Sequence, residues 1–300
     1  MKWNKYYEIN LFSCVKHFIY EMPFQGKYSN PQHELPFRSK IQLKKEVVSV
    51  QWDDLNDDER RDKVSITCAD GSEYIADHVI ITVSLGVLKE RINMFHPELP
   101  MNKSNAIKGL GIGTVDKIYL RYFHRWWPQD SAGFSLVWND EGAIAFKKEL
   151  VNNHMEDQDW LFDVFGFYSV DNHPLILCGW VVGSSAKKME QISSELVASG
   201  CNLLLNFFLS RLYSVPETAE VKRSDWFTNP HFRGSYSLRT METEKMGTSA
   251  EHLSHPVFNK EGKMVLQFAG EATHPHYFST VHGAVESGWR EADRSVKYLR

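Results

Sequence analysis

The residues of this sequence best suited to chemistry gather in the stretch FAGEATHPHYFSTVHG, residues 268–283. An apolar run ends at Gly270, and Glu271, several aromatic and hydroxyl residues and then a helical pattern starting near Ser279 follow it. The first turn of a helix has backbone N–H groups without partners, which stabilise partial negative charge. Glu271 would repel a phosphate, so its carboxylate suits hydroxyl donors such as those of a sugar alcohol. The same pattern also fits a structural role, in which Glu271 is a capping acid before a closely packed helix.

Lys117 is the second candidate, in the strand-like stretch GTVDKIYLRYF. The two-residue period of a strand places it on the same face as Val115, Tyr119 and Phe123. Two interpretations are open. The lysine stem covers apolar surface while its ammonium reaches solvent, or the amine is desolvated, with a lowered pKa suited to proton handling.

Other motifs do not support a site. GLGIGT, residues 109–114, has the wrong final spacing for a dinucleotide loop and leads into a strand, so we interpret it as a turn. His274 and His276 flank a proline, which favours a surface loop, and no metal site is predicted. The phosphate-loop, zinc-protease and hydrolase motifs do not occur in the sequence.

The elements that must position these residues fall into two blocks. Strands are expected in the first block over residues 40–53, 63–68 and 73–83, with the apolar run 78–83 buried on both faces at the centre of an α/β domain. Strands of a mostly antiparallel sheet are expected in the second block over residues 113–123, 133–138, 143–146, 160–170 and 174–183.

Two helices complete the expected structure. One follows Ser193, a good N-cap residue, and covers the antiparallel sheet. The other is the terminal helix, whose apolar residues are expected to face inward: Ala284, Val285, Gly288, Trp289, Ala292, Val296 and Leu299.

The sequence therefore predicts a mixed α/β (α+β) fold in which one domain interrupts another. Residues 41–94 and 225–300 would form the α/β domain, residues 95–224 the inserted mixed-sheet domain, and residues 1–40 a poorly defined lead-in. A cleft between the domains is the expected ligand site.

Composition limits the classes of function. The 300 residues carry a net charge of −4 with acids and bases mixed, so neither nucleic acid nor a membrane surface is an expected partner. The four cysteines are scattered without C-x-x-C spacing, which indicates a reducing compartment. Charged residues interrupt the apolar residues of the amino-terminal stretch, so no membrane span is predicted there.

The stretch QFAGEATHPHYFSTVHGAVESGWREADR closely resembles the carboxyl-terminal flavin motif of flavin-containing amine oxidases, most of all the animal polyamine oxidases. Four further stretches resemble the family in the same order: EVVSVQW, DGSEYIADHVIITVSLGVLK, GTVDKIYLRYFHRWWP and DWFTNPHFRGSYS. Together they cover nearly all of the chain from about Ile41.

The resemblance implies an FAD-binding Rossmann-like domain, a substrate domain and a set of site residues. Lys117 corresponds to the family's active-site lysine, which holds a water against the flavin. Glu271 corresponds to the acid that contacts the ribose or ribityl region of the cofactor. The other implied residues are Ser279, Thr280 and Val281 at the helix start beside the flavin ring, Val48 on the adenine side, Trp226 beside the flavin, and Tyr236, which with Thr280 frames the substrate amine.

The implied reaction is FAD-dependent oxidation of spermine, spermidine or acetylated polyamines by oxygen, giving an aldehyde, a shorter amine and hydrogen peroxide. The G-x-G-x-x-G turn, with the first βαβ unit that carries it, is not found, which predicts weakened FAD binding. Two alternatives stay open: a catalytically impaired, truncated remnant that binds a partner, and an oxidase of monoamines or of a histone lysine. Thr280 argues against monoamines, whose oxidases have a tyrosine there. Cytoplasm and peroxisome are both open, and the oligomeric state is not predicted.

Overall fold

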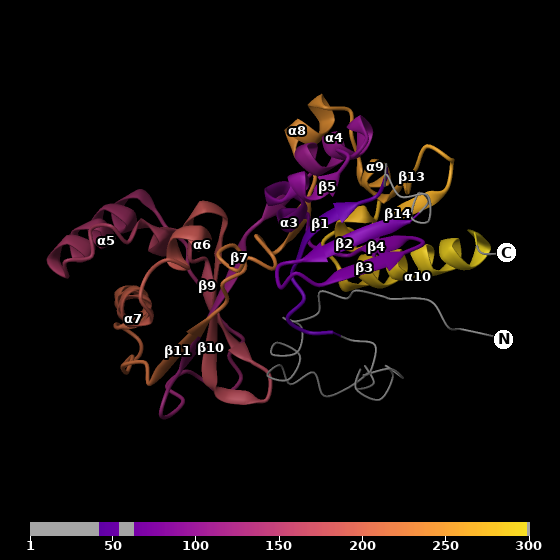
Figure 1. Cartoon of the computed structure of the whole chain (residues 1–300). Coiled ribbons are helices and arrows are strands. Elements are labelled where there is room, and N and C mark those ends of the chain that lie inside the picture. Colours follow the sequence, from indigo (N-terminus) through magenta and orange to yellow (C-terminus); the bar gives the residue numbers. More distant parts are fainter. Residues whose placement is uncertain (1–41, 54–62, 299–300) are drawn as a thin grey trace. The chain divides into compact units, whose positions relative to one another are not determined.

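The computed structural model describes residues 42–53 and 63–298, coloured along the sequence in Figure 1. The chain splits into two compact units, the first made of residues up to Ile112 and from Tyr236 onward, the second of Gly113–Ser235. The lead-in expected over residues 1–40 lies outside the described residues. None of the helices in the described ranges is both long and apolar enough for a bilayer crossing.

The first unit contains small mixed sheets, which confirms the expected mixed α/β class. Their strand orders are β3-β2-β1-β5, β13-β14-β4 and β12-β6. The pairs β1–β5 and β4–β14 are parallel, whereas β1–β2, β2–β3 and β13–β14 are antiparallel. The strands are β1 (Val47–Gln51), β2 (Val64–Cys68), β3 (Glu73–Ala76), β4 (Val79–Ile81), β5 (Phe95–His96), β6 (Gly111–Gly113), β12 (Tyr236–Leu238), β13 (Val257–Phe258) and β14 (Met264–Phe268).

The buried strand of the first unit is β14, all five residues of which are buried. The expectation that residues 78–83 form a central strand buried on both faces is wrong. Among the described strands β4 pairs only with β14 and lies at the edge of its sheet, so Val79 and Ile80 are only half-buried. The helices of this unit are α3 (Leu85–Glu90), η2 (Ile92–Met94), α4 (Met101–Gly109), α8 (Met241–Lys245), α9 (Ala250–Ser254), η4 (Glu271–Thr273) and α10 (Val281–Tyr298).

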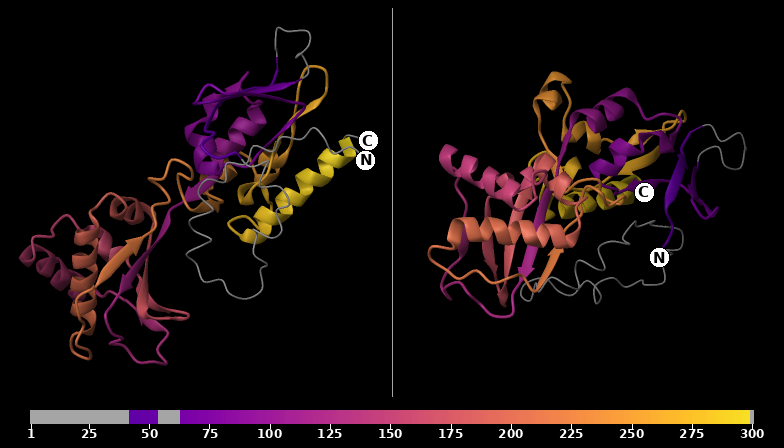
Figure 2. Two further views of the ribbon diagram at one scale, coloured as in Figure 1. Left: turned by 60° about the horizontal axis from the view of Figure 1, so that its bottom comes forward. Right: turned by 90° about the vertical axis from the view of Figure 1, so that its left-hand side faces the viewer.

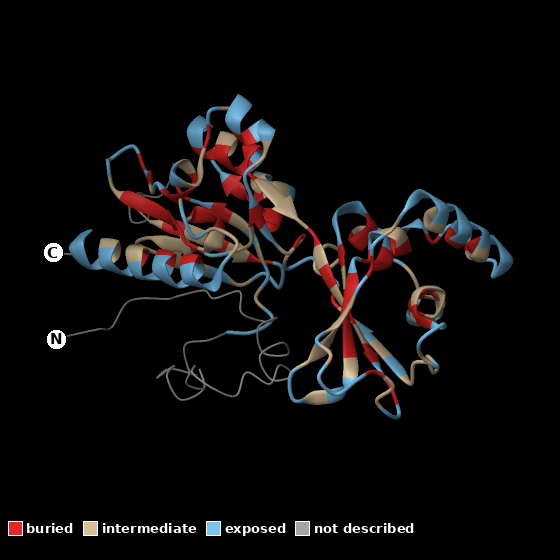
Figure 3. Cartoon of the chain, turned by 180° about the vertical axis from the view of Figure 1, so that it is seen from behind, coloured by how far each residue is buried: buried red, intermediate tan, exposed pale blue. Residues whose placement is uncertain are grey.

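Helix α10 turns its polar side inward, which contradicts the expected apolar stripe. Its buried residues are Gly283, Ser287 and Glu291, while Trp289 is 66% exposed. Figure 3 shows exposed residues along most of the helix. The buried side is polar because the Glu291 carboxylate accepts hydrogen bonds from Arg294 at 2.7 Å and from Gln267 at 3.0 Å. Leu299, the last residue of the expected stripe, lies outside the described residues.

The second unit is a five-stranded sheet of order β11-β7-β10-β9-β8 whose neighbours all pair antiparallel, as expected. Helix α7 lies across one face of this sheet, in both views of Figure 2, and Ser193 caps it by accepting a hydrogen bond from Leu196 N. The strands are β7 (Val115–Arg121), β8 (Gly133–Ser135), β9 (Gly166–Val170), β10 (His173–Val182) and β11 (Glu220–Arg223). The helices are α5 (Asp140–Asn152), η3 (Asp159–Asp163), α6 (Gly183–Met189) and α7 (Ser194–Leu209).

Two predictions for the second unit are wrong in detail. Residues 143–146 are helical within α5, because Asn139 caps the helix with a hydrogen bond from Gly142 N. Residues 160–170 begin with the turn η3 before the strand β9.

The unit boundaries also differ from the expected 95–224. The segment 95–112 belongs to the first unit because β5 pairs with β1 and α4 packs on α9. The segment 225–235 belongs to the second unit, where Ser235 exchanges hydrogen bonds with Val115 on β7.

Candidate functional site

Glu271 organises the turn before α10. Its Oε1 accepts a hydrogen bond from Ser237 N at 3.0 Å, and its Oε2 accepts from Ser237 Oγ at 2.7 Å and from Ser279 N at 2.5 Å. Ser279 Oγ in turn donates to the carbonyl of Ser237. The carboxylate therefore holds two separate segments of the first unit together, and Oε1 keeps a lone pair for a further donor.

The helix itself begins two residues later than expected, at Val281. Ser279 adopts a left-handed φ of 63°, which reverses the chain just before the helix. Thr280 then acts as the cap, because its Oγ1 accepts a hydrogen bond from Gly283 N at 3.1 Å. The amides of Val281 and His282 lie in the first turn, where they have no partner within the helix and can face an acceptor.

Val48 lies in an irregularity of β1. The register of β1 against β2 shifts between Val47 and Ser49, so Val48 is the extra residue of a bulge. Its side chain is 44% exposed, and its backbone is released from the ladder with β2. A residue without a partner in the ladder with β2 fits the backbone contact expected at this position.

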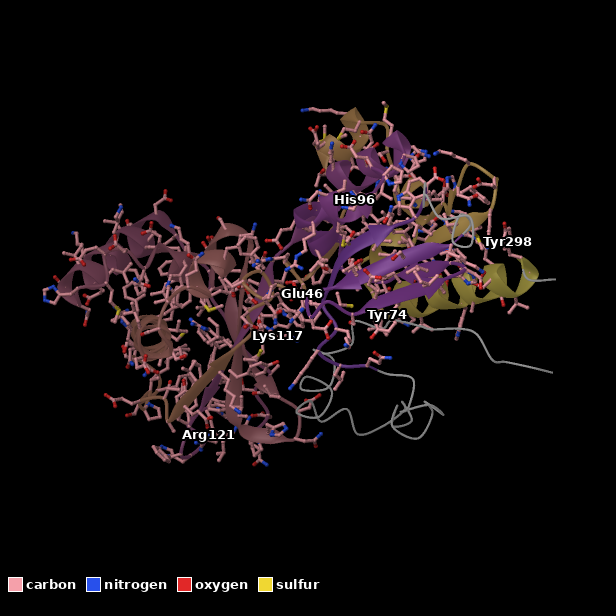
Figure 4. The ribbon with its side chains drawn as sticks, viewed as in Figure 1. Glu46, Tyr74, His96, Lys117, Arg121 and Tyr298 are labelled. Carbon is pink, nitrogen blue, oxygen red and sulfur yellow. The ribbon has the colours of Figure 1, made fainter. Side chains whose placement is uncertain are left out.

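Lys117 belongs to the second unit and lies on β7 with Arg121, as Figure 4 shows. The strand alternates as expected: Ile118 and Leu120 face the core, whereas Val115, Lys117 and Tyr119 are half-buried on the other face. Phe123 does not share this face because it follows the end of β7 and is 80% exposed.

Lys117 lies on the same face of the sheet as Trp180, Tyr119 and Cys178. Its Nζ lies 4.6 Å from the ring centroid of Trp180, its cross-strand partner on β10. Burial raises the pKa of Tyr119 to about 12 and that of Cys178 to about 11, so both are neutral near pH 7. Within the described residues no carboxylate forms an ion pair with Lys117, so its Nζ is available to act on a ligand.

The two aromatic candidates fall in different units. Trp226, in the second unit, is half-buried and packs edge-on against Phe232 at 4.9 Å between centroids. Tyr236, in the first unit, starts β12 and is 39% exposed. The structure thus joins Glu271 and Ser279 by a hydrogen bond and sets Thr280 and Val281 next to them, while Lys117 and Trp226 belong to the other unit.

The first unit carries features that fit a dinucleotide cofactor: a bulged backbone at Val48, the first-turn helix amide at Val281, and an acceptor at Glu271. Gly270 adopts a φ of 126°, and the space where its Cβ would lie is open. This leaves room for a ligand to approach the backbone there.

Sequence reasoning missed Ser237, Trp180 and Asp116. The signal for Asp116 was visible, because strand alternation puts this acid on the apolar face of β7 with Ile118 and Leu120. Nothing near Ser237 or Trp180 in the sequence indicated their partners, which are distant along the chain.

Comparison with known proteins agrees with these features. The family described as flavin containing amine oxidoreductase matches residues 17–295. The match begins earlier than the expected start near Ile41, in residues that the structure does not describe.

The human protein named peroxisomal N(1)-acetyl-spermine/spermidine oxidase is 37% identical over 239 residues, covering 77% of this chain and 45% of that protein. Probable polyamine oxidase 5 of Arabidopsis thaliana is 30% identical over 295 residues, covering 87% of this chain and 52% of the relative. The chain therefore spans about half the length of these curated relatives.

A solved structure of a redesigned putrescine oxidase aligns with a TM-score of 0.61 at 18% identity, over 87% of this chain and 50% of that one. This likeness shows a shared amine oxidase fold. With the family match over most of its length, the chain belongs to the flavin-containing amine oxidoreductase family.

Proposed function

We propose that this chain acts in FAD-dependent oxidation of polyamines: spermine, spermidine or their acetylated forms. The observation that carries the proposal is Lys117, a half-buried lysine beside Trp180 with no carboxylate ion pair within the described residues. The sequence resemblance assigns this position to the family's active-site lysine. FAD, when bound, supplies a hydride acceptor for the carbon next to the amine nitrogen and passes the two electrons to oxygen, which becomes hydrogen peroxide. Water then converts the oxidised amine to an aldehyde and a shorter amine.

The residues proposed to hold FAD are Val48 through its backbone on the adenine side, Glu271 at the ribose or ribityl hydroxyls, and Ser279, Thr280 and Val281 at the start of α10. The positive end of the α10 dipole would stabilise negative charge on the flavin ring. Trp226 is proposed to lie beside the flavin, and Tyr236 and Thr280 to frame the amine. The free lone pair on Glu271 Oε1 supports its role as an acceptor.

Lys117 is proposed to handle the proton of the substrate amine and to hold a water. A free amine with a pKa near that of lysine, about 10.4, is almost fully protonated at neutral pH, and only its neutral form releases hydride readily. We therefore expect the rate of flavin reduction to rise with pH from neutral into the alkaline range.

The test is anaerobic mixing of the flavin-loaded chain with N1-acetylspermine, spermine or spermidine. The flavin absorbance band should bleach, and hydrogen peroxide should form when oxygen is admitted. Benzylamine and a peptide carrying monomethyl-lysine probe the monoamine and histone-lysine alternatives. A protein that carries stoichiometric flavin but bleaches with none of the polyamines would contradict the proposal.

The relatives favour the oxidase over the second expected function, a catalytically impaired binding protein. The name of the human relative places that enzyme in peroxisomes. For this chain we propose either a peroxisomal or a cytoplasmic location, which imaging of the tagged chain against a peroxisomal marker would distinguish.

A further inference from the structure

Two carboxyl groups meet in the core of the second unit, on the face of β7 opposite to Lys117. Asp116 is fully buried on β7, and Glu190, which follows α6, is 7% exposed. Glu190 acts to raise the pKa of Asp116, after burial itself, which places the two carboxyl groups close together. Oδ2 of Asp116 receives no N–H or O–H donor from the described residues. Two ionised carboxylates in such a place would repel each other strongly. One proton between them removes the repulsion and supplies the missing donor.

A hydrogen-bonded path leads from Asp116 to Lys117. Ser224 Oγ donates to Asp116 Oδ1 at 2.6 Å and accepts from the backbone N of Lys117 at 2.9 Å. Ser224 N also donates to the carbonyl of Lys117 at 3.1 Å. The backbone of Lys117 is thus tied on both sides to the serine that Asp116 orients.

A second path leads from the same carboxyl groups to the segment that carries Trp226. Glu190 accepts hydrogen bonds from Phe227 N at 2.9 Å and from Thr228 N at 2.6 Å. The segment that includes Trp226 is thus held at both ends, because Asp116 accepts from Ser224 Oγ before it and Glu190 accepts from Phe227 N after it. The amides of Phe227 and Thr228 are donors, and Glu190 is their acceptor. These amides therefore depend on the carboxyl pair for their hydrogen bonds.

We propose that Asp116 and Glu190 share one proton and are positioning residues, which hold the backbone of Lys117 and the turn carrying Trp226 in place for the reaction. This inference rests on the proposed function, in which Lys117 and Trp226 serve the flavin and the amine. Neither acid touches the substrate, so their effect passes through Ser224 and the turn.

Burial raises the pKa of Asp116 to about 8, and Glu190 acts in the same direction. Stability from the neutral carboxyl is full below its ordinary pKa of 3.8 and is lost as the pH rises through about 8. The charged and titratable groups on the segments around the pair include Lys187 and Lys188 on α6, Asp163 on η3, Arg223 on β11, and Asp225, His231 and Arg233 in the turn. Lys187 lies 4.2 Å from the Phe227 ring, Lys188 pairs with Asp159, Asp163 accepts from Ser185 Oγ, and the two arginines donate to backbone carbonyls. Loss of the shared proton would loosen the turn, so the rise of flavin reduction with pH expected from the substrate amine should stop and reverse above about pH 8.

Infrared spectroscopy of the whole chain tests the shared proton without any need for turnover. At pH 6 to 7 the native chain should show a carboxylic acid C=O band that disappears in Asp116→Asn. The exposed turn residue Asp171 provides the matched control, and Asp171→Asn should keep the band. An identical spectrum for the native chain and Asp116→Asn overturns the inference, even if the chain oxidises polyamines. A band that behaves as expected in a chain that oxidises no amine supports the pair and refutes the proposed function instead.

Kinetics then tests positioning. In Asp116→Asn the amide still accepts from Ser224 and donates permanently to Glu190, so flavin reduction should keep its rate and lose its alkaline limit. Asp116→Ala should reduce the flavin about 10- to 100-fold more slowly, with little change in KM. Ser224→Ala should do the same if Asp116→Ala does not fold, and Ser224→Thr should restore the rate. Equal rates and pH profiles in Asp116→Asn, Asp116→Ala and the native chain would show that the pair positions nothing.

Discussion

Two glycines on α10 give opposite predictions for the same substitution. A Cβ on Gly283 would lie 2.1 Å from the carbonyl oxygen of Tyr277 and 2.8 Å from its carbon, whereas a Cβ on Gly288 meets nothing within 4 Å. Gly283→Ala must therefore push the first turn of the helix from the Tyr277 carbonyl by roughly 1 Å to reach van der Waals distance. Such overpacking costs about 1–3 kcal/mol, whereas Ala in place of an exposed helical Gly stabilises by about 1 kcal/mol.

Thermal unfolding of the flavin-free chain, followed by circular dichroism, measures both variants. The midpoint temperature of the transition that includes α10 should fall for Gly283→Ala and rise by about 2–4 °C for Gly288→Ala. The same shift should weaken flavin binding in Gly283→Ala alone, because Thr280 and Val281 lie in the displaced turn. Equal changes in both variants, in stability or in flavin affinity, would refute the argument that the Tyr277 carbonyl excludes a side chain at Gly283.

Three further predictions follow from single side chains. The Glu271 carboxylate accepts three hydrogen bonds, and in Glu271→Gln the amide NH₂ would face one of these donors. The substitution should therefore lower the unfolding free energy of the flavin-free chain by about 2 kcal/mol. Unchanged stability with weakened flavin binding would mean that Glu271 contacts only the cofactor. Burial lowers the pKa of Lys103 from 10.5 to about 7, so Lys103 should make the unfolding free energy rise as the pH goes from about 7 to 10.5. Titrations from pH 7 to 10.5 should show this rise in the native chain and in the exposed control Lys108→Met relative to Lys103→Met, and equal slopes in all three would contradict it. Lys117→Met should slow flavin reduction by about 10²-fold in stopped-flow traces with flavin content unchanged, and a native rate would remove Lys117 from the reaction.

Much of the local structure could be predicted because local chemistry specifies it. Ser193 caps α7, and the alternation along β7 separates Lys117 from the core residues Ile118 and Leu120, as expected. The strand, turn and helix order around Glu271 was also predictable, since an apolar run, a glycine and a hydroxyl cap occur in sequence. These features depend on neighbours within a few residues.

The sequence by itself determined the mixed α/β class, the antiparallel sheet and the family's flavin motif. Only the tertiary structure decided which side of α10 is buried, because the buried Glu291 takes donors from Gln267 on β14 and Arg294, and this polar network outweighs the apolar periodicity. The tertiary structure alone also decided that Asp116 lies near Glu190, which is 74 positions away by residue number. Hydrophobic periodicity reports on a single element, whereas the partner of a buried charge depends on how distant elements pack.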